Sequence, residues 1–231
     1  MSDVNLLDNC DNCTKIWKNF SFLTRNELNM VEDNKYEALF KPGETIIKQG
    51  SPTSNALFLG SGMAKTYIEG HNGRNFILNI ALPGQLLLGP GAYTNSRHTF
   101  SVAALTTVNA CFISFDVFRK LMRSNSDFAE SLLVDVSTMS LRAHTRLVSQ
   151  SQKRMPGRLA DTLLYFSEEV FFADEYDIIL SRQELGEMAN MAKECVVRIL
   201  KELEEMEVIR SDSSRIRIID KKKLIQISEK G

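Results

Sequence analysis

The chain has 231 residues, enough for one large domain or two modest ones that each have a core. Hydrophobic residues make up 43% of it and charged residues 25%, which is ordinary for a soluble globular protein. The formal net charge of −1 excludes a chain that is basic throughout, so any contact with nucleic acid must come from a local basic surface.

The N-terminus is polar and acidic, without the basic and apolar regions of a signal peptide. No uncharged apolar run reaches about 18 residues, so we expect no membrane span. Together these observations predict a cytoplasmic protein whose four cysteines are reduced thiols. The cysteines are Cys10, Cys13, Cys111 and Cys195.

Short apolar runs alternate with glycine- and proline-containing turns from about Phe40 to Phe115. For example, the turn Gln49–Pro52 follows the apolar run Thr45–Lys48, and Gly70–Gly73 leads into the run Asn75–Ile80. Turn signals at intervals of about 8–12 residues predict an all-β sandwich or barrel.

The segment Asp127–Gln152 contains neither glycine nor proline, which predicts a helix of roughly 35–40 Å. An apolar stripe recurs in it at a spacing of three to four residues and is formed by Leu132, Val136, Met139 and Ala143. The stripe fits either packing on the β domain or a seam with a second copy of the chain. Arg142 and Arg146 flank it and keep it narrow, which favours the dimer seam.

A helix-turn-helix pattern occupies the C-terminal part of the chain. Ser181 and Glu184 form a capping box at the start of the first helix. Asn190–Ala192 supplies a tight turn, because asparagine tolerates left-handed backbone. Lys193–Glu205 then predicts a second helix whose buried face consists of Val196, Ile199, Leu200 and Leu203.

The residues after this helix predict a β-hairpin with a polar turn at Ser211–Ser214. Strand alternation places Ile216 and Ile218 inward and Arg215 and Arg217 outward. A capped helix, a tight turn, a second helix and a basic hairpin together predict a DNA-binding winged helix.

The exposed face of the second helix carries side chains that suit the DNA major groove. Arg198 can bond bidentately to guanine, and Glu194 can accept a hydrogen bond from cytosine. The residues that we expect to read bases are Lys193, Glu194, Val197 and Arg198. Those that we expect at the DNA backbone are Ser181, Arg182, Gln183, Lys201, Arg215 and Arg217, with a further phosphate contact from Lys193. Alternatively, Glu194 and Arg198 form only an i,i+4 ion pair worth roughly 0.3–0.5 kcal/mol.

Motifs along nearly the whole chain resemble the cyclic AMP receptor protein and fumarate-nitrate regulator (Crp/Fnr) family of bacterial transcription factors. Leu180–Leu185 and Val197–Leu203 are similar to its helix-turn-helix, and Gly157–Leu164 to the opening of its DNA-binding domain. Turns similar to those of its β-roll are Phe40–Glu44, Gly50–Pro52, Ser61–Gly62 and Pro83–Gln85.

The resemblance implies an α+β fold with three parts. These are a β-roll (double-stranded β-helix) sensor domain with a short N-terminal helical segment at residues 1–126, a dimerisation helix at 127–154, and a winged helix-turn-helix at 155–231. It also implies a homodimer that couples a signal in the β-roll to a palindromic DNA operator. If the protein is an activator, RNA polymerase is a further partner.

Two departures from the family pattern matter. Ala192 and Cys195 stand where family members often carry serine and threonine, which removes a helix cap and phosphate contacts. Cyclic-nucleotide members carry Gly-Glu-Leu for the ribose, whereas Leu88–Gly91 is Leu-Gly-Pro-Gly here. Pro90 has neither a carboxylate nor an N–H, so we do not expect cyclic AMP to be the effector.

A further expectation is an effector pocket for another anion. Its candidate residues are Gly89, Arg97, His98 and Thr99, together with Ala143 and His144 of the long helix. Alternatively, Arg97 and His98 are solvated loop residues and His144 flanks the dimer seam.

The cysteines offer an alternative function, an iron–sulfur or thiol-based redox sensor. Cys10 and Cys13 have metal-ligand spacing, and Cys111 falls where the oxygen-sensing branch of the family carries its distant cluster ligand. Asn19 replaces that branch's third N-terminal cysteine, so one of the usual four thiolates is missing. Cys111 can equally be a small buried hydrophobic residue, and we predict neither a metal nor a cofactor.

Other classes of function fit less well. His71, His98 and His144 stand in separate segments, and the sequence has no nucleophile elbow or phosphate-binding loop, so we expect no enzyme. A ligand-binding regulatory subunit that does not bind DNA would have no use for the hairpin wing and the recognition helix.

Overall fold

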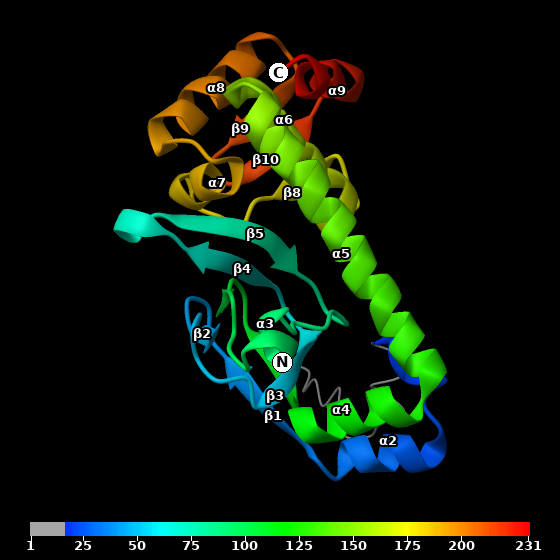
Figure 1. Cartoon of the computed structure of the whole chain (residues 1–231). Helices are drawn as coiled ribbons and strands as arrows, with labels where there is room; N and C mark the ends of the chain where they lie inside the picture. Colours follow the sequence, from blue (N-terminus) through cyan, green and yellow to red (C-terminus); the bar gives the residue numbers. More distant parts are fainter. Residues whose placement is uncertain (1–16) are drawn as a thin grey trace, which may run out of the picture. The chain divides into compact units, whose positions relative to one another are not determined.

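The computed structural model describes residues 17–231, so Cys10 and Cys13 lie outside the described residues (Figure 1). The chain divides into two compact units. The first contains the residues up to Glu69 and Asn79–Ser140, and the second contains Gly70–Leu78 and Leu141–Gly231. Among the described helices, none has both the length and the apolar character needed to cross a lipid bilayer.

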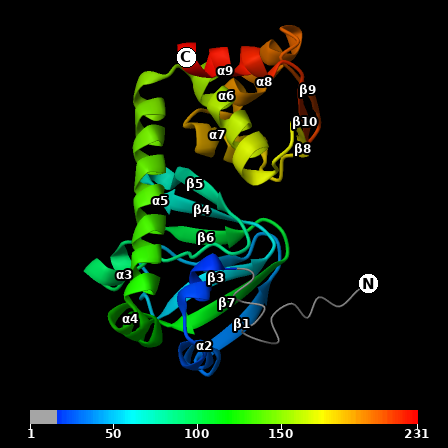
Figure 2. The same ribbon diagram turned by 90° about the vertical axis from the view of Figure 1, so that its right-hand side faces the viewer.

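The first unit is built on two antiparallel sheets, seen as separate layers in Figure 2. One has the order β1 (Lys35–Phe40), β7 (Val108–Ser114), β3 (Asn55–Ser61). The other has the order β2 (Thr45–Ile47), β6 (Ser101–Ala104), β4 (Ala64–Glu69), β5 (Asn75–Ala81). Apart from β4 and β5, neighbouring strands come from distant parts of the sequence, as in a β-roll, and the expected arrangement of short strands is confirmed.

One turn of the roll requires glycine. Gly62 joins β3 to β4 with a φ of +82°, and a Cβ there would collide with the carbonyl oxygen of Thr107. No other residue fits both constraints, because side chains disfavour positive φ.

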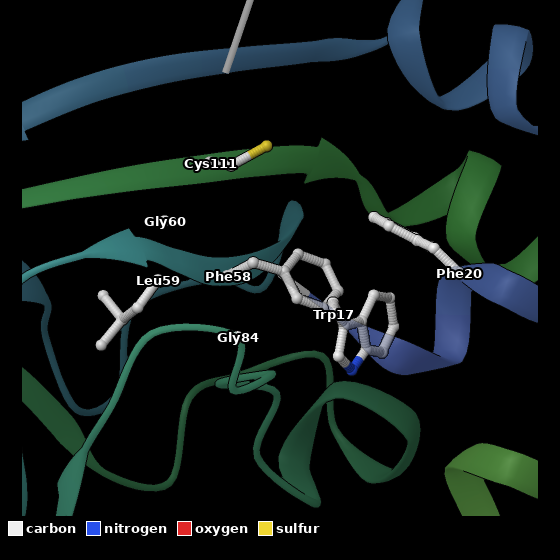
Figure 3. A pocket seen from close by; sticks show the side chains of 7 residues that line it. All are labelled: Trp17, Phe20, Phe58, Leu59, Gly60, Gly84 and Cys111. Atoms are coloured by element: carbon white, nitrogen blue, oxygen red, sulfur yellow. The ribbon is translucent and has the colours of Figure 1, made fainter. Parts of the chain in front are cut away.

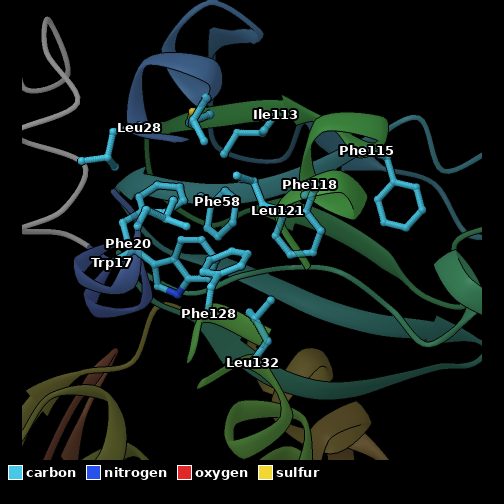
Figure 4. Close-up of a cluster of buried hydrophobic side chains, with 14 of the residues drawn as sticks. Trp17, Phe20, Leu28, Phe58, Ile113, Phe115, Phe118, Leu121, Phe128 and Leu132 are labelled. Carbon is cyan, nitrogen blue, oxygen red and sulfur yellow. The ribbon is translucent and has the colours of Figure 1, made fainter. Parts of the chain in front are cut away.

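An aromatic core covers one face of the three-stranded sheet (Figure 4). Phe58 on β3 lies opposite Cys111 on β7, and the Trp17 ring packs on Phe58 with centroids 4.0 Å apart. Phe128 contacts both Trp17 and Phe118 edge-on. The helices that supply the rest of this core are η1 (Lys18–Phe22), α2 (Arg25–Glu32), α4 (Phe115–Ser124) and the start of α5 (Ser126–Gln152).

The long helix α5 confirms the predicted helix but not the whole predicted seam. Leu132 is only 4% exposed, because it lies one helical turn after Phe128 and joins it in the aromatic core. The expectation that Leu132 lies in a dimer seam is therefore wrong. The next residue along the helix, Leu133, is exposed instead. The large apolar side chains that α5 exposes are Leu133, Val134, Val136, Met139, Leu141, Leu147 and Val148. Ala143 is exposed as well.

The second unit contains the winged helix. Its helices are α6 (Met155–Tyr165), the π-helical η3 (Phe166–Val170), α7 (Arg182–Ala189), α8 (Lys193–Glu205) and α9 (Lys221–Lys230). Its sheet has the order β8 (Glu175–Asp177), β10 (Arg215–Ile218), β9 (Ile209–Asp212). Pro156 lies in the first turn of α6, where its missing N–H costs nothing, and α6 begins at Met155, three residues after α5 ends at Gln152.

Polar contacts anchor the C-terminal half of α5 within this unit. Asp161 of α6 accepts hydrogen bonds from Lys153 at 2.8 and 2.9 Å, and also from Ser149 and Ser228. These contacts join the end of α5 to α6 and α9, so the last turns of α5 belong structurally to the winged helix.

Arg146 does not flank the apolar stripe as expected, because its guanidinium turns inward. It donates hydrogen bonds to the carbonyl oxygens of Ile77, Leu78 and Met188, all within the second unit. Burial lowers its pKa to about 10, so it remains a cation at neutral pH.

Candidate nucleic-acid interface

The first helix of the helix-turn-helix, α7, begins at the predicted capping box. The Ser181 hydroxyl accepts a hydrogen bond from the Glu184 N–H at 3.2 Å, and the Glu184 carboxylate accepts one from the Ser181 N–H at 2.8 Å. Ser181 and Gln183 are exposed beside this helix end. Their position leaves both side chains open to solvent.

The turn between α7 and α8 depends on two residues. Asn190 ends α7 in the left-handed conformation, with φ 54° and ψ 55°, as the sequence predicts. Gly186 was not singled out from the sequence, yet a Cβ there would lie 2.5 Å from the carbonyl oxygen of Met191. Because Gly186 has no side chain, the turn can pass close to α7. This close approach determines the angle at which α8 leaves the turn.

The second helix, α8, has the predicted two faces. The four apolar residues expected inside are all buried. The face opposite them exposes Lys193, Glu194, Val197, Arg198 and Lys201. Ala192 is the N-cap of this helix and provides no side-chain hydrogen bond, as expected from the missing serine.

Ion pairs along α8 differ from the alternative considered from the sequence. Arg198 bonds to Glu202 at 2.6 Å, one turn later, instead of to Glu194. Lys201 lies 3.7 Å from Glu205 in the same way. Exposed pairs of this kind contribute only about 0.3–0.5 kcal/mol to stability. Arg198 and Lys201 can therefore exchange their glutamate partners for another anion at a small cost in free energy.

The wing is the hairpin of β9 and β10. Ile216 and Ile218 are buried, while Arg215 and Arg217 are exposed, as strand alternation predicts. The turn is shorter than expected, because Ser213 adopts a φ of +54° and closes the hairpin in two residues.

Arg182 has a different place from the one expected for a phosphate contact. Its guanidinium donates hydrogen bonds to the Ser213 carbonyl at 2.6 Å and to the Ser211 hydroxyl at 3.2 Å. Glu204 of α8 accepts a hydrogen bond from the Ser211 N–H at 2.7 Å. Arg182 and Glu204 therefore hold the wing against the two helices.

Family models match both parts of the chain. A cyclic nucleotide-binding domain matches residues 37–125, and a Crp-like helix-turn-helix domain matches residues 157–227. The transcriptional activator protein Anr of Pseudomonas protegens is 26% identical over 184 residues, which cover 78% of this chain and 75% of that protein. The cAMP-activated global transcriptional regulator CRP of Salmonella typhimurium is 27% identical over 183 residues, 74% of this chain and 84% of that protein.

The chain belongs to the Crp/Fnr family.

Solved structures share the fold of this Crp/Fnr protein. FixK2 from Bradyrhizobium japonicum superimposes with a TM-score of 0.76 at 18% identity, covering 84% of this chain and 96% of that one. A putative regulator of the family from Eubacterium rectale gives a TM-score of 0.77 at 16% identity, covering 93% and 99%. Members of the family bind DNA as dimers and act with RNA polymerase. The protein is a Crp/Fnr-type transcriptional regulator and not an enzyme.

The effector pocket expected in the β-roll is only partly assembled. Arg97 is exposed, and its guanidinium donates a hydrogen bond to the Gly50 carbonyl at 2.6 Å. A Cβ on Gly89 would lie 2.9 Å from the Phe100 ring and 3.1 Å from the Thr99 hydroxyl, so these segments pack tightly. Thr99 is exposed; Ala143 and His144 are exposed on α5, in the part of it assigned to the second unit.

His98 corrects one of the two expectations, because it is buried and not a solvated loop residue. It is 9% exposed, and its Nδ1 has no hydrogen-bond partner among the described residues. Burial lowers its pKa, which favours the neutral imidazole at neutral pH. The candidate anion site therefore keeps one cation, Arg97.

Cys111 is buried in the β-roll. It is 5% exposed and forms one wall of a small apolar cavity, whose other lining residues are Trp17, Phe20, Phe58, Leu59, Gly60 and Gly84 (Figure 3). Residues 17–231 contain no group of three or more histidine, cysteine or acidic side chains arranged to bind a metal. Asn19 is also buried, and its amide donates a hydrogen bond to Asp135 at 2.8 Å. Of the three cysteines considered for a cluster, Cys111 is the one that lies among the described residues.

The uncapped end of α8 generates a first prediction. Ala192 has φ −70° and ψ 151°, the extended backbone that an N-cap requires. Ala192→Ser should raise the free energy of unfolding by about 1 kcal/mol, because the hydroxyl can accept a backbone N–H of the first turn. Urea unfolding measures the change, and Ala192→Val, which has no acceptor, serves as the control. Equal stability of the serine and valine variants would contradict the prediction.

The buried His98 predicts a pH dependence of stability. Because its pKa is lowered in the folded chain, the unfolded chain binds more protons below about pH 6.5. The free energy of unfolding should therefore fall as the pH drops through that value. His98→Leu should remove this part of the loss, whereas the exposed His144→Leu should keep it. Urea unfolding at about pH 7.5 and about pH 5.5 tests this, and identical losses for the wild type and His98→Leu would refute it.

Proposed function

We propose that this Crp/Fnr regulator reads a palindromic operator as a homodimer, with α8 of each protomer in a major groove. The observation that carries the proposal is the exposed face of α8, which combines long polar side chains with a firmly buried opposite face. Two copies related by a two-fold axis would present their helices about one DNA turn apart.

The exposed residues of α8 divide between base and backbone contacts. Arg198 supplies the forked donors that match guanine, and Glu194 the acceptor that matches cytosine. Lys193 and Val197 complete the base-reading set. The phosphate contacts come from Ser181, Gln183, Lys193, Lys201, Arg215 and Arg217, while the bonds of Arg182 to the wing give it chiefly a positioning role.

Arg198 tests the base-reading role. Arg198→Ala should weaken operator binding by about 1–3 kcal/mol and relax the preference at one base pair of each half-site. Selection of binding sites from a random DNA pool measures this preference. Glu202→Gln is the matched control, because it removes the ion pair seen in the structure but keeps the arginine. If Arg198→Ala selects the same motif with undiminished preference, Arg198 does not read a base.

The dimer seam that we propose is the exposed apolar face of α5, centred on Leu133. Seven large apolar side chains exposed along one 27-residue helix are typical of an interaction surface. Val136, Met139 and Ala143 belong to this face, whereas Leu132 does not.

Neighbouring leucines of α5 test this seam. Leu133 is 64% exposed. The variant Leu133→Glu should be monomeric, because a dimer would bury two like charges across the seam. Leu132→Ala should instead lower the free energy of unfolding by about 2–5 kcal/mol and remain dimeric, because it opens a cavity in the protomer core. Sedimentation equilibrium gives the oligomeric state. A monomeric wild type at micromolar concentration, or a dimeric Leu133→Glu variant, would rule out this seam.

We also propose that the effector is not cyclic AMP. Pro90 replaces the carboxylate that the family uses for the ribose, and the buried neutral His98 adds no charge beside Arg97. The protein would act in the cytoplasm, where an activator of this type meets RNA polymerase. Its signal would reach α8 through the β-roll and α5.

Calorimetric titration with cyclic AMP checks the effector proposal. We expect no saturable binding at low-micromolar ligand, and any weak heat should vanish in high salt, because Arg97 alone attracts phosphates without specificity. Arg97→Ala should abolish that residual signal. A salt-resistant low-micromolar dissociation constant would overturn the proposal.

A further inference from the structure

The short strand β8 was not anticipated from the sequence, and it lies beside the wing. Its central residue, Tyr176, is buried, stacks on Phe171 with ring centroids 5.2 Å apart and donates its hydroxyl to the Leu163 carbonyl at 2.7 Å. Strand alternation then forces the residues on either side, Glu175 and Asp177, to point outward.

The register between β8 and β10 brings these carboxylates onto the wing arginines. Asp177 lies opposite Arg215, and Glu175 opposite Arg217. The Arg215 guanidinium donates through Nε and Nη2 to the two oxygens of Asp177, each at 3.2 Å. Arg217 approaches a single oxygen of Glu175, Oε2, with Nε at 2.8 Å and Nη2 at 2.5 Å.

Both pairs are accessible, and the Arg215–Asp177 pair has the two-oxygen geometry that arginine also uses on phosphate. All four side chains are exposed. The hydrogen bond from Arg215 holds the pKa of Asp177 below its usual value, so this carboxylate is ionised at neutral pH. A carboxylate and a phosphate accept hydrogen bonds from the same guanidinium N–H groups, so each arginine can give these donors to only one of the two.

We propose that Glu175 and Asp177 restrain the affinity for DNA by competing with its phosphates for Arg217 and Arg215. The inference rests on the proposed phosphate contacts of these two arginines. Each wing must exchange its internal ion pairs for DNA phosphates, and the freed carboxylates then face the DNA backbone. This restraint acts on the backbone contacts and therefore lowers the affinity for every sequence alike, leaving base reading by α8 untouched.

The test is a variant in which both acids of β8 become amides, Glu175→Gln with Asp177→Asn, in the full-length protein. The control, Glu130→Gln with Glu229→Gln, removes the same charge from exposed positions on α5 and α9. Fluorescence anisotropy measures binding to the selected operator and to a scrambled duplex over a range of salt concentrations. We expect the β8 variant to bind both duplexes more tightly than the control, by roughly two- to thirtyfold per protomer, the range that two exposed ion pairs supply. The gain should shrink as salt rises.

Arg217→Ala in both backgrounds separates this inference from the function on which it rests. It should weaken binding more in the β8 variant than in the wild type, because only the wild type loses a competing ion pair together with the phosphate contact. Equal weakening in the two backgrounds, or a β8 variant that binds no better than the control, would overturn the competition while keeping the phosphate contact. If Arg217→Ala weakens binding in neither background, the phosphate contact itself is wrong and the inference fails with it.

Discussion

Burial of one face of α8 is the constraint on which the DNA-binding surface depends. Val196, Ile199, Leu200 and Leu203 are nearly inaccessible to solvent, and each contributes roughly 1.5–3 kcal/mol by leaving water. That burial fixes the rotation of the helix about its axis, because a rotation by one residue position, about 100°, would move part of this set out of the core. The buried apolar residues of α8 therefore determine which of its polar residues face outward. Gly186 and Asn190 then fix how the helix leaves its neighbour.

The wing applies the same logic with a period of two. Buried Ile216 and Ile218 force Arg215 and Arg217 outward, and buried Tyr176 does the same for the acids beside it on β8. A surface of mixed charge results, in keeping with the net charge of −1. The affinity for DNA phosphates is therefore a difference between attraction to DNA and attraction within the protein, and small changes in either would shift it.

Local signals predicted most of this architecture, because caps, turns and periodicity act over a few residues. The capping box at Ser181, the left-handed Asn190 and the limits of α8 are examples. Features that depend on distant partners were missed. Three residues of β8 carry no pattern of their own until β10 pairs with them. Leu132 was misplaced because the core that buries it includes Trp17 and Phe58, which are distant in the sequence. Arg198 has a glutamate one turn before and one turn after it, so spacing alone could not choose Glu202.

A β-roll can keep its fold while the chemistry of its binding site changes. Gly89 still packs against Phe100 and Thr99, and a Cβ on Gly91 would collide with the Arg97 carbonyl, so the backbone path of these segments is set by close packing. The groups that would recognise a cyclic nucleotide are not needed for that packing, and Pro90 or a buried His98 can replace them at little cost to the roll. The ligand-binding groups of such a site can change without disturbing the packing of the roll, whereas burial of one face fixes the orientation of α8. This difference explains why the DNA-binding surface was readable from the sequence and the identity of the signal was not.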